Sequence, residues 1–475
     1  MFVAMIALPI LSIRWTGGEY SQAEKRFLAG WPALFSQDGT LAAEAGSSFK
    51  SWFEDHIGFR EKLVALHAQV RSGLFRLSPS DRVHIGKDGW YYYTLDENLE
   101  ISTGRYTLTQ ETLEQILSRH LAVRDKLAGM GIDYVILLPT SKVSIYPEYM
   151  RYGDGQIRET PVDIVADYLE ERSDLKVVRL KEALLEEKKD RQVYFKTDTH
   201  WTQEGAYAAY REIVRRMQEW GLCETGPIDV AFADTTFTGE LGAMMGLELP
   251  AEPAKEIVFP RKDAVLDPPT QRSARFSQAV AAAGVHDPCR HFENGAAQGP
   301  SVLMFGDSMF GGWNATDLLA EHFPEFSYVW STDIDGGILE AMEPDVVIYE
   351  LTERYWNVFP SKNRGFIQTA LDGHQAEVVS YEWEGETLRV TVRNSSAWAW
   401  SGMDWIRLGV FKDGMDTGLR ADMPGSEVVD PGEEIVFTID LEDGATSSGV
   451  KVEVQMLQEG ICYFGQRVQV AGAPG

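Results

Sequence analysis

The stretch VLMFGDSMFGGW, from Val302 to Trp313, indicates how the central part of this 475-residue chain folds. It opens with four consecutive apolar residues, a run typical of a strand buried on both faces of a parallel sheet. The triplet GDS follows and ends at Ser308, and two more glycines stand at positions 311 and 312. Glycines there permit a sharp turn, so we expect Ser308 at the carboxyl end of the strand, where α/β proteins place functional groups.

Similar apolar runs stand on either side of this stretch. DYVILLP at 133–139 and PDVVIYEL at 344–351 predict two more buried strands. Segments with helical spacing separate the strands, and the strongest of them runs from residue 203 to residue 220. The alternation predicts a three-layer α/β/α domain with a parallel sheet, which we place at residues 20–375. We expect residues 222–300, which are rich in Pro, Ala and Gly, to be irregular.

A second polar motif precedes the first. The stretch QVYFKTDTHW, from Gln192 to Trp201, begins with four residues that we interpret as another strand of the same sheet. Asp198 and His200 follow at a spacing of two, which on an extended segment puts both side chains on one side. Because parallel strands end at one edge of a sheet, we expect both motifs to meet there.

The three polar residues fit a catalytic triad. A serine hydroxyl is a weak nucleophile and needs an adjacent base, for which His200 is the candidate. Asp198 would orient the imidazole and stabilise its charged form, and the backbone N–H of Ser308, assisted by Gly311 or Gly312, would bind an oxyanion. Alternatives remain: GDS could cap a helix, and the Asp–His pair could be a structural hydrogen bond or half of a metal site.

The pattern changes after residue 375. Segments with period-two alternation are separated by turn signals, which predicts a β-sandwich over residues 376–475. Three tryptophans lie close together there, and alternation puts Trp398 and Trp400 on one face of a strand, near Trp405. They could stack on sugar rings as a carbohydrate-binding surface, or they could pack in the sandwich core.

The net charge of the chain limits the classes of molecule that it could bind. There are 44 Lys and Arg against 72 Asp and Glu, a formal net charge of −28. A nucleic-acid-binding protein needs a basic surface, so that class is excluded, and a neutral or weakly charged substrate fits better than a polyanion. Lys142 and Arg354 follow predicted strands, where they could contact a sugar or an acidic group, or form surface salt bridges.

The sequence contains no pattern that indicates a bound metal ion or organic cofactor. The three cysteines (Cys223, Cys289 and Cys462) form no metal-ligand pattern, although one disulfide is conceivable in an oxidising compartment. No phosphate-binding or dinucleotide-binding glycine motif is present, so we expect no cofactor. Residues 1–19 begin with an apolar run up to Ile13, which we interpret as the second half of a signal or anchor segment, or else as a buried terminus.

Several motifs in the first 355 residues resemble one protein family. GDS after a strand, with Asp and His elsewhere, resembles the SGNH hydrolase superfamily, although its common members place the histidine last. The order His200 before Ser308, in the blocks TDTHWTQEGA and LMFGDSMF, resembles the AlgJ/AlgX-type polysaccharide O-acetyltransferases of the bacterial envelope. AEKRFLAGWP, IGKDGWYYY, PTSKVSIYPEYM and PDVVIYELTERY are similar to further family motifs, although Lys25 replaces an Asn. The separate Gly and Asn oxyanion blocks of the superfamily are not identifiable.

The resemblance implies an enzyme that moves an acetyl group through Ser308 onto polysaccharide hydroxyls, with His200 as base and Asp198 as orienting group. It also implies a periplasmic or envelope location, an acetyl donor passed on by a membrane-bound O-acyltransferase, and membrane association through the N-terminus. Two rivals remain. A carbohydrate acetylesterase would use the same triad with water as acceptor, and a non-catalytic sugar-binding subunit of an export complex would not need Ser308.

Overall fold

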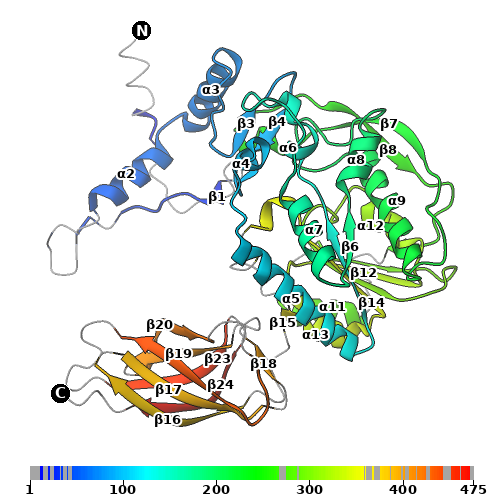
Figure 1. Ribbon diagram of the computed structural model, residues 1–475. Coiled ribbons are helices and arrows are strands. Elements are labelled where there is room, and N and C mark those ends of the chain that lie inside the picture. The colour runs from blue at the N-terminus through cyan, green and yellow to red at the C-terminus, as the bar shows by residue number, and fades with distance from the viewer. Residues whose placement is uncertain are drawn as a thin grey trace.

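The computed structural model describes most of the chain (Figure 1). The described residues are 11–13, 20–21, 26–32, 34–35, 40, 45–266, 274–285, 288–357, 359, 366–367, 375–385, 387–396, 399–401, 406–412, 414–423, 428–441, 451–459 and 462–470. The apolar N-terminal run, Trp398 and Trp405 therefore lie largely or wholly outside the described residues.

A seven-stranded sheet forms the centre of the α/β domain, in the order β6-β5-β14-β11-β12-β10-β9. Its five parallel strands are β6 (Lys176–Arg179), β5 (Asp133–Leu138), β14 (Val346–Glu350), β11 (Val302–Gly306) and β12 (Glu325–Trp330). Two short strands, β10 (Arg290–Glu293) and β9 (Val265–Leu266), continue the sheet in antiparallel fashion. The predicted fold class is confirmed, but the sheet is mixed rather than purely parallel.

Helices cover both faces of this sheet, which gives the three layers. One face packs against α5 (Gln110–Gly129), α7 (Pro161–Arg172), α11 (Ala274–Ala282) and α13 (Gly336–Met342). The other packs against α4 (Asn98–Thr103), α6 (Lys142–Ile145), α8 (Lys181–Glu187), α9 (Gln203–Glu219) and α12 (Ala315–Ala320). The fully apolar strands are buried on both sides, as their sequence required.

The prediction that residues 222–300 are irregular is wrong. This segment contains a hairpin of β7 (Ala231–Phe237) and β8 (Glu252–Val258), the short helix α10 (Leu241–Met244), and then β9, α11 and β10. The hairpin strands are partly exposed, so their sequence lacks the apolar runs by which buried strands are recognised.

The interpretation of residues 192–195 as a strand of the main sheet is also wrong. Tyr194 and Trp201 form only an isolated antiparallel bridge, and the chain between them turns back on itself. Thr202 then caps α9 by accepting the Gly205 backbone N–H at 3.2 Å. His200 therefore enters the site from a loop ahead of a helix, since no neighbouring strand pairs with this segment.

The C-terminal strands form two antiparallel sheets around a separate apolar core. One sheet contains β16 (Ala376–Glu384), β17 (Thr387–Asn394) and β22 (Glu434–Asp440). The other contains β20 (Met415–Asp422), β19 (Ile406–Lys412), β23 (Val452–Gln458) and β24 (Cys462–Val470). Short strands β18 (Trp400–Ser401) and β21 (Val428–Val429) form a further pair.

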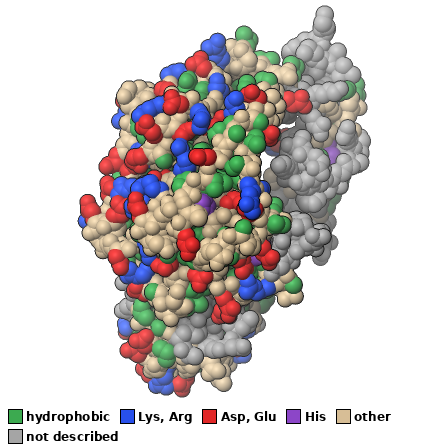
Figure 2. Space-filling view, turned by 90° about the vertical axis from the view of Figure 1, so that its right-hand side faces the viewer, with side chains coloured by type: hydrophobic (Ala, Val, Ile, Leu, Met, Phe, Trp, Pro, Cys, Tyr) green, Lys and Arg blue, Asp and Glu red, His purple; other side chains and the backbone are tan. Residues whose placement is uncertain are grey.

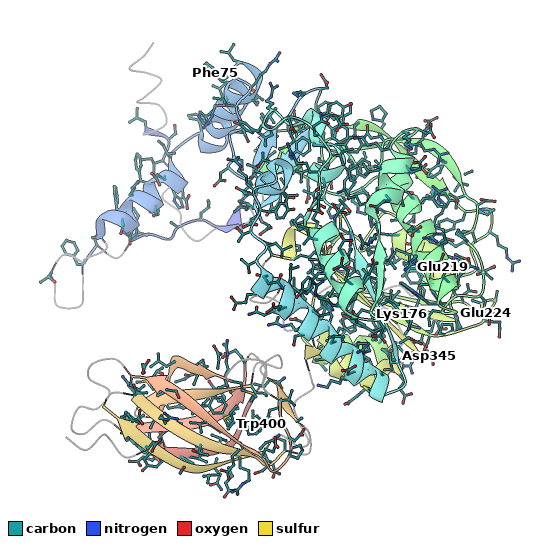
Figure 3. The ribbon with its side chains drawn as sticks, viewed as in Figure 1. Phe75, Lys176, Glu219, Glu224, Asp345 and Trp400 are labelled. Atoms are coloured by element: carbon teal, nitrogen blue, oxygen red, sulfur yellow. The ribbon has the colours of Figure 1, made fainter. Side chains whose placement is uncertain are left out.

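Trp400 is not available for stacking on a sugar. Its ring is fully buried in the sandwich, lies edge-on to Phe464 at 5.8 Å, and donates from Nε1 to the Ser396 hydroxyl at 2.9 Å (Figure 3). The prediction of Trp400 as a substrate contact is therefore wrong, because a large aromatic side chain here contributes more by filling the core.

The N-terminal segment forms an arm of short elements ahead of the α/β domain (Figure 1). They are β1 (Tyr20–Ser21), β2 (Arg26–Phe27), α2 (Ala45–His56) and α3 (Arg60–Gly73). The hairpin of β3 (Val83–Ile85) and β4 (Tyr91–Tyr93) follows and belongs to the α/β domain, because Tyr92 lies in the core of that domain. Further short strands elsewhere are β13 (Ile334–Asp335) and β15 (Phe366–Ile367). Within the described part of the chain, no helix has both the length and the apolar character needed to cross a bilayer.

Two helical glycines give a matched test of the loop ahead of α9. A Cβ at Gly205 would overlap the backbone carbonyl of Val193, whereas a Cβ at Gly129 in α5 meets nothing within 4 Å. We expect Gly205→Ala to lower the free energy of unfolding by about 1–3 kcal/mol through overpacking. Gly129→Ala should leave it unchanged or raise it by up to about 1 kcal/mol. Urea unfolding of both variants measures the difference, and equal stabilities would contradict the packing of Val193 on α9.

Candidate active site

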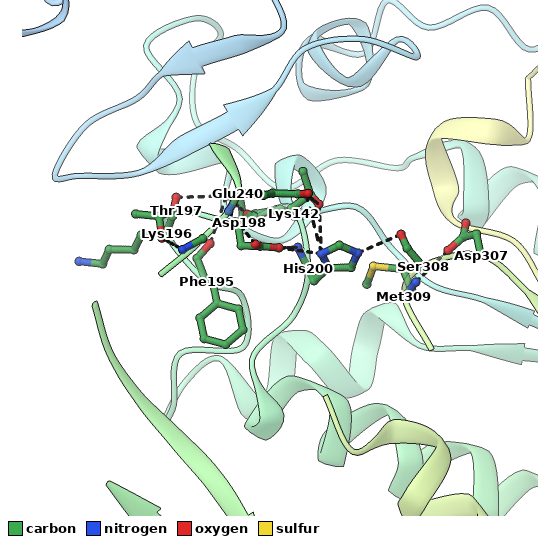
Figure 4. Close-up of polar contacts among 12 residues, drawn as sticks. Lys142, Phe195, Lys196, Thr197, Asp198, His200, Glu240, Asp307, Ser308 and Met309 are labelled. Atoms are coloured by element: carbon green, nitrogen blue, oxygen red, sulfur yellow. Dashed lines mark hydrogen bonds and ion pairs between the residues drawn. The ribbon is translucent and has the colours of Figure 1, made fainter. Parts of the chain in front are cut away.

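The structure brings Ser308, His200 and Asp198 together in one hydrogen-bonded line (Figure 4). Nε2 of His200 lies 2.9 Å from Oγ of Ser308, and Nδ1 lies 2.6 Å from Oδ1 of Asp198. In this geometry the hydroxyl donates to Nε2 and the Nδ1–H donates to the carboxylate. Asp198 is buried, whereas His200 and Ser308 are half-buried and can be reached from solvent. A Ser–His–Asp line at the carboxyl edge of an α/β sheet defines the class of acyl-transferring and acyl-hydrolysing enzymes.

Ser308 is held by the turn that follows β11. The buried carboxylate of Asp307 accepts from the Met309 backbone N–H at 3.0 Å. It also accepts from the Thr352 N–H at 2.9 Å and from the Thr352 hydroxyl at 2.8 Å. Asp307 thus ties the nucleophile turn to the end of β14. It does not cap a helix, because α12 begins only at Ala315.

Glu350, the last residue of β14, completes this support. Its carboxyl accepts the Asp307 backbone N–H at 2.8 Å, and any side chain at Gly306 would overlap it. Burial raises the pKa of Glu350 well above its usual range, and the negative charge of Asp307 raises it further, so Glu350 keeps its proton. Sequence reasoning missed this residue, although an acid between the apolar run VVIY and Leu351 was a usable signal.

Asp198 is fixed by backbone donors on two sides. Oδ1 accepts the His200 N–H at 3.0 Å and Oδ2 accepts the Glu240 N–H at 3.0 Å. Burial alone would raise the pKa of Asp198, but the hydrogen bond and charge of His200, with these N–H donors, lower it overall. The group therefore stays ionised, as an orienting carboxylate must.

Lys142 does not face a substrate. Its side chain is 5% exposed, and Nζ donates to backbone carbonyls of the loop that carries Asp198 and His200. The prediction of Lys142 as a substrate contact is wrong, because an ammonium with its three protons engaged by buried carbonyls has no donor left for a ligand.

Arg354 lies in a short 3₁₀ turn (Glu353–Tyr355) after β14. Its guanidinium sits 4.7 Å from the centre of the Tyr355 ring and 5.8 Å from that of Tyr93. Burial alone would lower the pKa of Arg354, but the neighbouring Tyr355 and Asp307 raise it, so the cation is retained. A role in substrate binding stays a prediction.

The candidates for the oxyanion donor can now be judged. The Ser308 backbone N–H has no acceptor among the described residues, so it stays available, whereas the Gly311 N–H donates to the Ser308 carbonyl at 3.3 Å. A side chain at Gly312 would meet nothing within 4 Å. The side-chain amide of Asn314 is oriented toward Gln203, because one of its two N–H groups donates to Oε1 of Gln203 at 2.8 Å. Trp313 and Asn314 both adopt left-handed backbone conformations (φ 64° and 58°). Non-glycine residues rarely adopt this conformation outside functional sites and tight turns.

Trp313 is a neighbour of the triad that sequence reasoning did not single out. Its half-buried ring lies 5.4 Å from the ring of His200, and 5.2 and 5.1 Å from those of Phe195 and Phe237. The aromatic cluster limits the movement of the imidazole and forms an apolar wall beside it. The tryptophan that ends the GDSMFGGW stretch was the available signal.

Glu240 lies beside Asp198 and His200, so three side chains that could bind a metal ion meet here. Ligand atoms of Asp198, His200 and Glu240 lie within 4.8 Å of one another. A cation on Nδ1 would displace the Asp198 hydrogen bond, and Nε2 is already engaged by Ser308. The donor set therefore fits a triad better than a metal centre. Cys223 and Cys289 are both buried, and neither of them forms a disulfide bond.

Comparison with known proteins identifies the domain. Residues 83–287 match the family ALGX, described as an SGNH hydrolase-like domain of acetyltransferase AlgX. The chain is 24% identical over 289 residues to a probable alginate O-acetylase AlgJ of Pseudomonas syringae pathovar tomato. This match covers 58% of the chain and 68% of that protein.

Two solved structures are similar to the chain. The O-acetyltransferase domain of Pseudomonas putida AlgJ aligns with a TM-score of 0.40 at 19% identity, covering 59% of this chain and 93% of that domain. Pseudomonas aeruginosa AlgX aligns with a TM-score of 0.38 at 13% identity, covering 80% of this chain and 95% of that chain.

Residues 83–287 thus form an SGNH hydrolase-like acetyltransferase domain. The matches to the AlgX family model and to the AlgJ protein agree with the resemblance that the motifs of the chain indicated. The family resemblance, the fold class and the assignment to acetyltransferases are confirmed. The matched residues include Asp198 and His200 and end before Ser308, so the role of each triad residue stays a prediction.

Two acidic residues beside His200 give a matched pair for testing the triad. Asp198→Asn should lower the rate of acetyl-ester cleavage by about 10³–10⁴-fold, because an amide stabilises the wrong imidazole tautomer. The half-exposed carboxylate of Glu240 lies 4.0 Å from Nδ1, and Glu240→Gln should change the rate by less than about fivefold, since exposed pairs contribute little. Steady-state kinetics of acetyl-ester cleavage by both variants test this expectation. Similar decreases in rate for the two variants would argue against Asp198 as the orienting group.

Proposed function

We propose that this protein transfers acetyl groups onto polysaccharide hydroxyls through an acetyl-enzyme formed on Ser308. The observation that supports the proposal is the continuous line from Ser308 through His200 to buried Asp198, with contacts of 2.9 and 2.6 Å. A positioned base next to a half-exposed hydroxyl is what acyl transfer requires.

In the first half-reaction, Oγ of Ser308 attacks the acetyl carbonyl of the donor. His200 accepts the hydroxyl proton at Nε2, and Asp198 stabilises the imidazolium that forms. The backbone N–H of Ser308 donates to the oxyanion, and Gly312, where a side chain would meet nothing within 4 Å, leaves room nearby. When the tetrahedral intermediate collapses, the donor's oxygen leaves with the proton from His200, and the acetyl ester of Ser308 remains.

In the second half-reaction, a sugar hydroxyl takes the place of the departed donor. His200 removes its proton as the hydroxyl oxygen attacks the acetyl ester, and then returns a proton to Oγ as Ser308 is released. Water in the same position would give hydrolysis, so transfer requires that the acceptor excludes water. The apolar wall of Trp313, Phe195 and Phe237 beside His200 supports this exclusion.

The acceptor that we propose is a neutral or weakly charged polysaccharide. The similar protein of Pseudomonas syringae is named for alginate, but this chain carries a net charge of −28, and the half-exposed carboxylate of Glu240 stands beside the triad. Acidic and basic side chains are interspersed on the face shown in Figure 2, where the described residues form no continuous basic tract. A polyanion would be repelled at distances up to about 8–10 Å in physiological salt.

We also propose that the protein works in the periplasm or at the outer side of the cell envelope, with a membrane-bound O-acyltransferase as the source of acetyl groups. The apolar run up to Ile13 supports membrane association. So does the arm, where the exposed residues Leu66, Val70 and Leu74 share one side of α3, and Phe75 stands at its end (Figure 3). Four basic residues and one acidic residue lie between positions 57 and 77, in contrast to the rest of this acidic chain.

The acetyl-enzyme can be trapped. After incubation with an activated acetyl ester, rapid acid quenching and peptide mass spectrometry, we expect acetyl on the peptide containing Ser308, and none in Ser308→Ala. A neutral oligosaccharide should then become acetylated while release of free acetate falls. Acetate release that is unaffected by every acceptor would indicate an esterase. An unlabelled Ser308 with a functional Ser308→Ala variant would indicate a sugar-binding subunit.

The arm can be tested with lipid vesicles. Replacing Leu74 and Phe75 by Ser should reduce co-sedimentation with anionic vesicles severalfold, because each buried CH₂ group contributes about 0.8 kcal/mol. The matched control replaces Met415 and Val428, which are equally exposed on the β-sandwich, and should leave sedimentation unchanged. Equal binding by all three proteins would contradict a membrane role of the arm.

A further inference from the structure

The loop that carries the base of the triad has no strand partner. Residues 195–200 leave the single bridge at Tyr194 and reach α9 without pairing to the main sheet. The hydrogen bond between His200 and Ser308 nevertheless depends on the position of this loop, because Ser308 lies on another segment of the chain. Two backbone bonds from outside the sheet reach the loop, from the Tyr91 N–H to the Lys196 carbonyl at 2.9 Å and from the Leu241 N–H to the Thr197 carbonyl at 3.1 Å, and side chains supply further contacts.

On one side, Lys142 at the start of α6 binds the carbonyls of the loop. Its Nζ donates to the oxygen of Phe195 at 3.1 Å, of Lys196 at 3.3 Å and of Asp198 at 2.6 Å (Figure 4). The rings of Tyr92 and Trp90 lie 5.1 and 5.8 Å from Nζ. Three donors thus meet three acceptors in a buried, aromatic environment.

On the other side, Glu252 at the start of β8 binds the amides of the same loop. One carboxylate oxygen accepts the Lys196 N–H at 2.9 Å. The other accepts the Thr197 N–H at 2.9 Å and the Thr197 hydroxyl at 2.6 Å. Glu252 is 8% exposed, so these charge-assisted bonds are shielded from water.

We propose that Lys142 and Glu252 act as a pair of positioning residues, a clamp in which a cation on the loop's carbonyls and an anion on its amides set His200 against Ser308. The inference rests on the proposed function of the triad. Both charges polarise the same peptide groups in the same sense, which strengthens each hydrogen bond. Neither side chain touches the reacting atoms, so the clamp acts only through Asp198 and His200.

Burial and the nearby carboxylates act in opposite directions on Lys142. Burial lowers the pKa of Lys142 to about 7, and Asp198, Glu252 and Glu240 oppose that shift. Keeping an amine in so buried a place is unfavourable unless its donors are all used. The three carbonyls of the loop use them, while no carboxylate of the described residues forms an ion pair with Nζ.

The test compares Lys142→Met and Glu252→Gln with Lys181→Met in the full chain. Lys181 is the control, since it is 6% exposed, donates to the carbonyl of Arg158 at 2.6 Å and pairs with Asp163, and no hydrogen bond of its side chain reaches the loop of His200. The readouts are the rate at which a sulfonyl fluoride modifies Ser308, and kcat and KM for acetyl-ester cleavage. We expect Lys142→Met to lower kcat and the modification rate by about 10–100-fold, as for a displacement of about 1 Å, with KM changed less than threefold. Glu252→Gln should act in the same direction, and Lys181→Met should leave both rates within twofold.

The outcomes separate the clamp from the proposed function. If the wild-type Ser308 fails to react, the triad itself is refuted. If the wild type reacts and a folded Lys142→Met variant reacts equally fast, the clamp is refuted while the triad stands. Should Lys142→Met not fold, Glu252→Gln carries the test, because it keeps the side-chain size, and an unchanged rate there overturns the proposal. An increase in KM without a change in kcat would also overturn the proposal, since that result would assign Lys142 to substrate binding.

Discussion

The site depends on the buried acidic residues at the end of β14. Glu350 accepts the backbone N–H of Asp307, and so holds the turn that presents Ser308. Three residues later, Glu353 accepts from the Ser141 N–H at 2.8 Å and the Ser144 hydroxyl at 2.6 Å, and so fixes α6. One strand end therefore supports the nucleophile directly and, through α6 and Lys142, the loop that bears the base. Burial raises the pKa of both glutamates, a free-energy cost that hydrogen bonds offset only where the geometry is kept.

This arrangement explains how a triad can form with the histidine ahead of the serine. The hydrogen bond between Ser308 and His200 joins segments 108 residues apart, and only Ser308 follows a strand of the sheet. In a triad the positions of three groups matter and the chain order does not. The loop of residues 195–200 supplies His200 without occupying a place in the main sheet, so its position rests on side-chain contacts and on two backbone bonds from Tyr91 and Leu241. The residues of the site are thus held by a few polar contacts, whereas the sheet and helices beneath them are held by many apolar contacts.

The sequence could predict the parts of the fold that buried apolar residues specify. β5, β11 and β14 are unbroken apolar runs, and α9 has a strong helical period, so each was predictable from local pattern. The β7–β8 hairpin was not, because its partly exposed strands carry no such run. Trp400 was ambiguous for a related reason: an aromatic residue in a strand has the same local pattern whether it lines a ligand surface or a core. The exposure of its ring is decided by the opposite sheet of the sandwich.

By itself, the sequence determined the chemistry of the site. Ser308 after a strand, and Asp198 two residues from His200, limit the possible reactions because few residue types can form an activated nucleophile. Only the tertiary structure decided which polar residues support that chemistry. Lys142 and Arg354 look alike in sequence, each shortly after a strand, yet Lys142 is enclosed by the carbonyls of a distant loop while Arg354 lies against Tyr355 and Tyr93. The difference arises from long-range contacts, and no local pattern encodes which backbone a buried charge will meet.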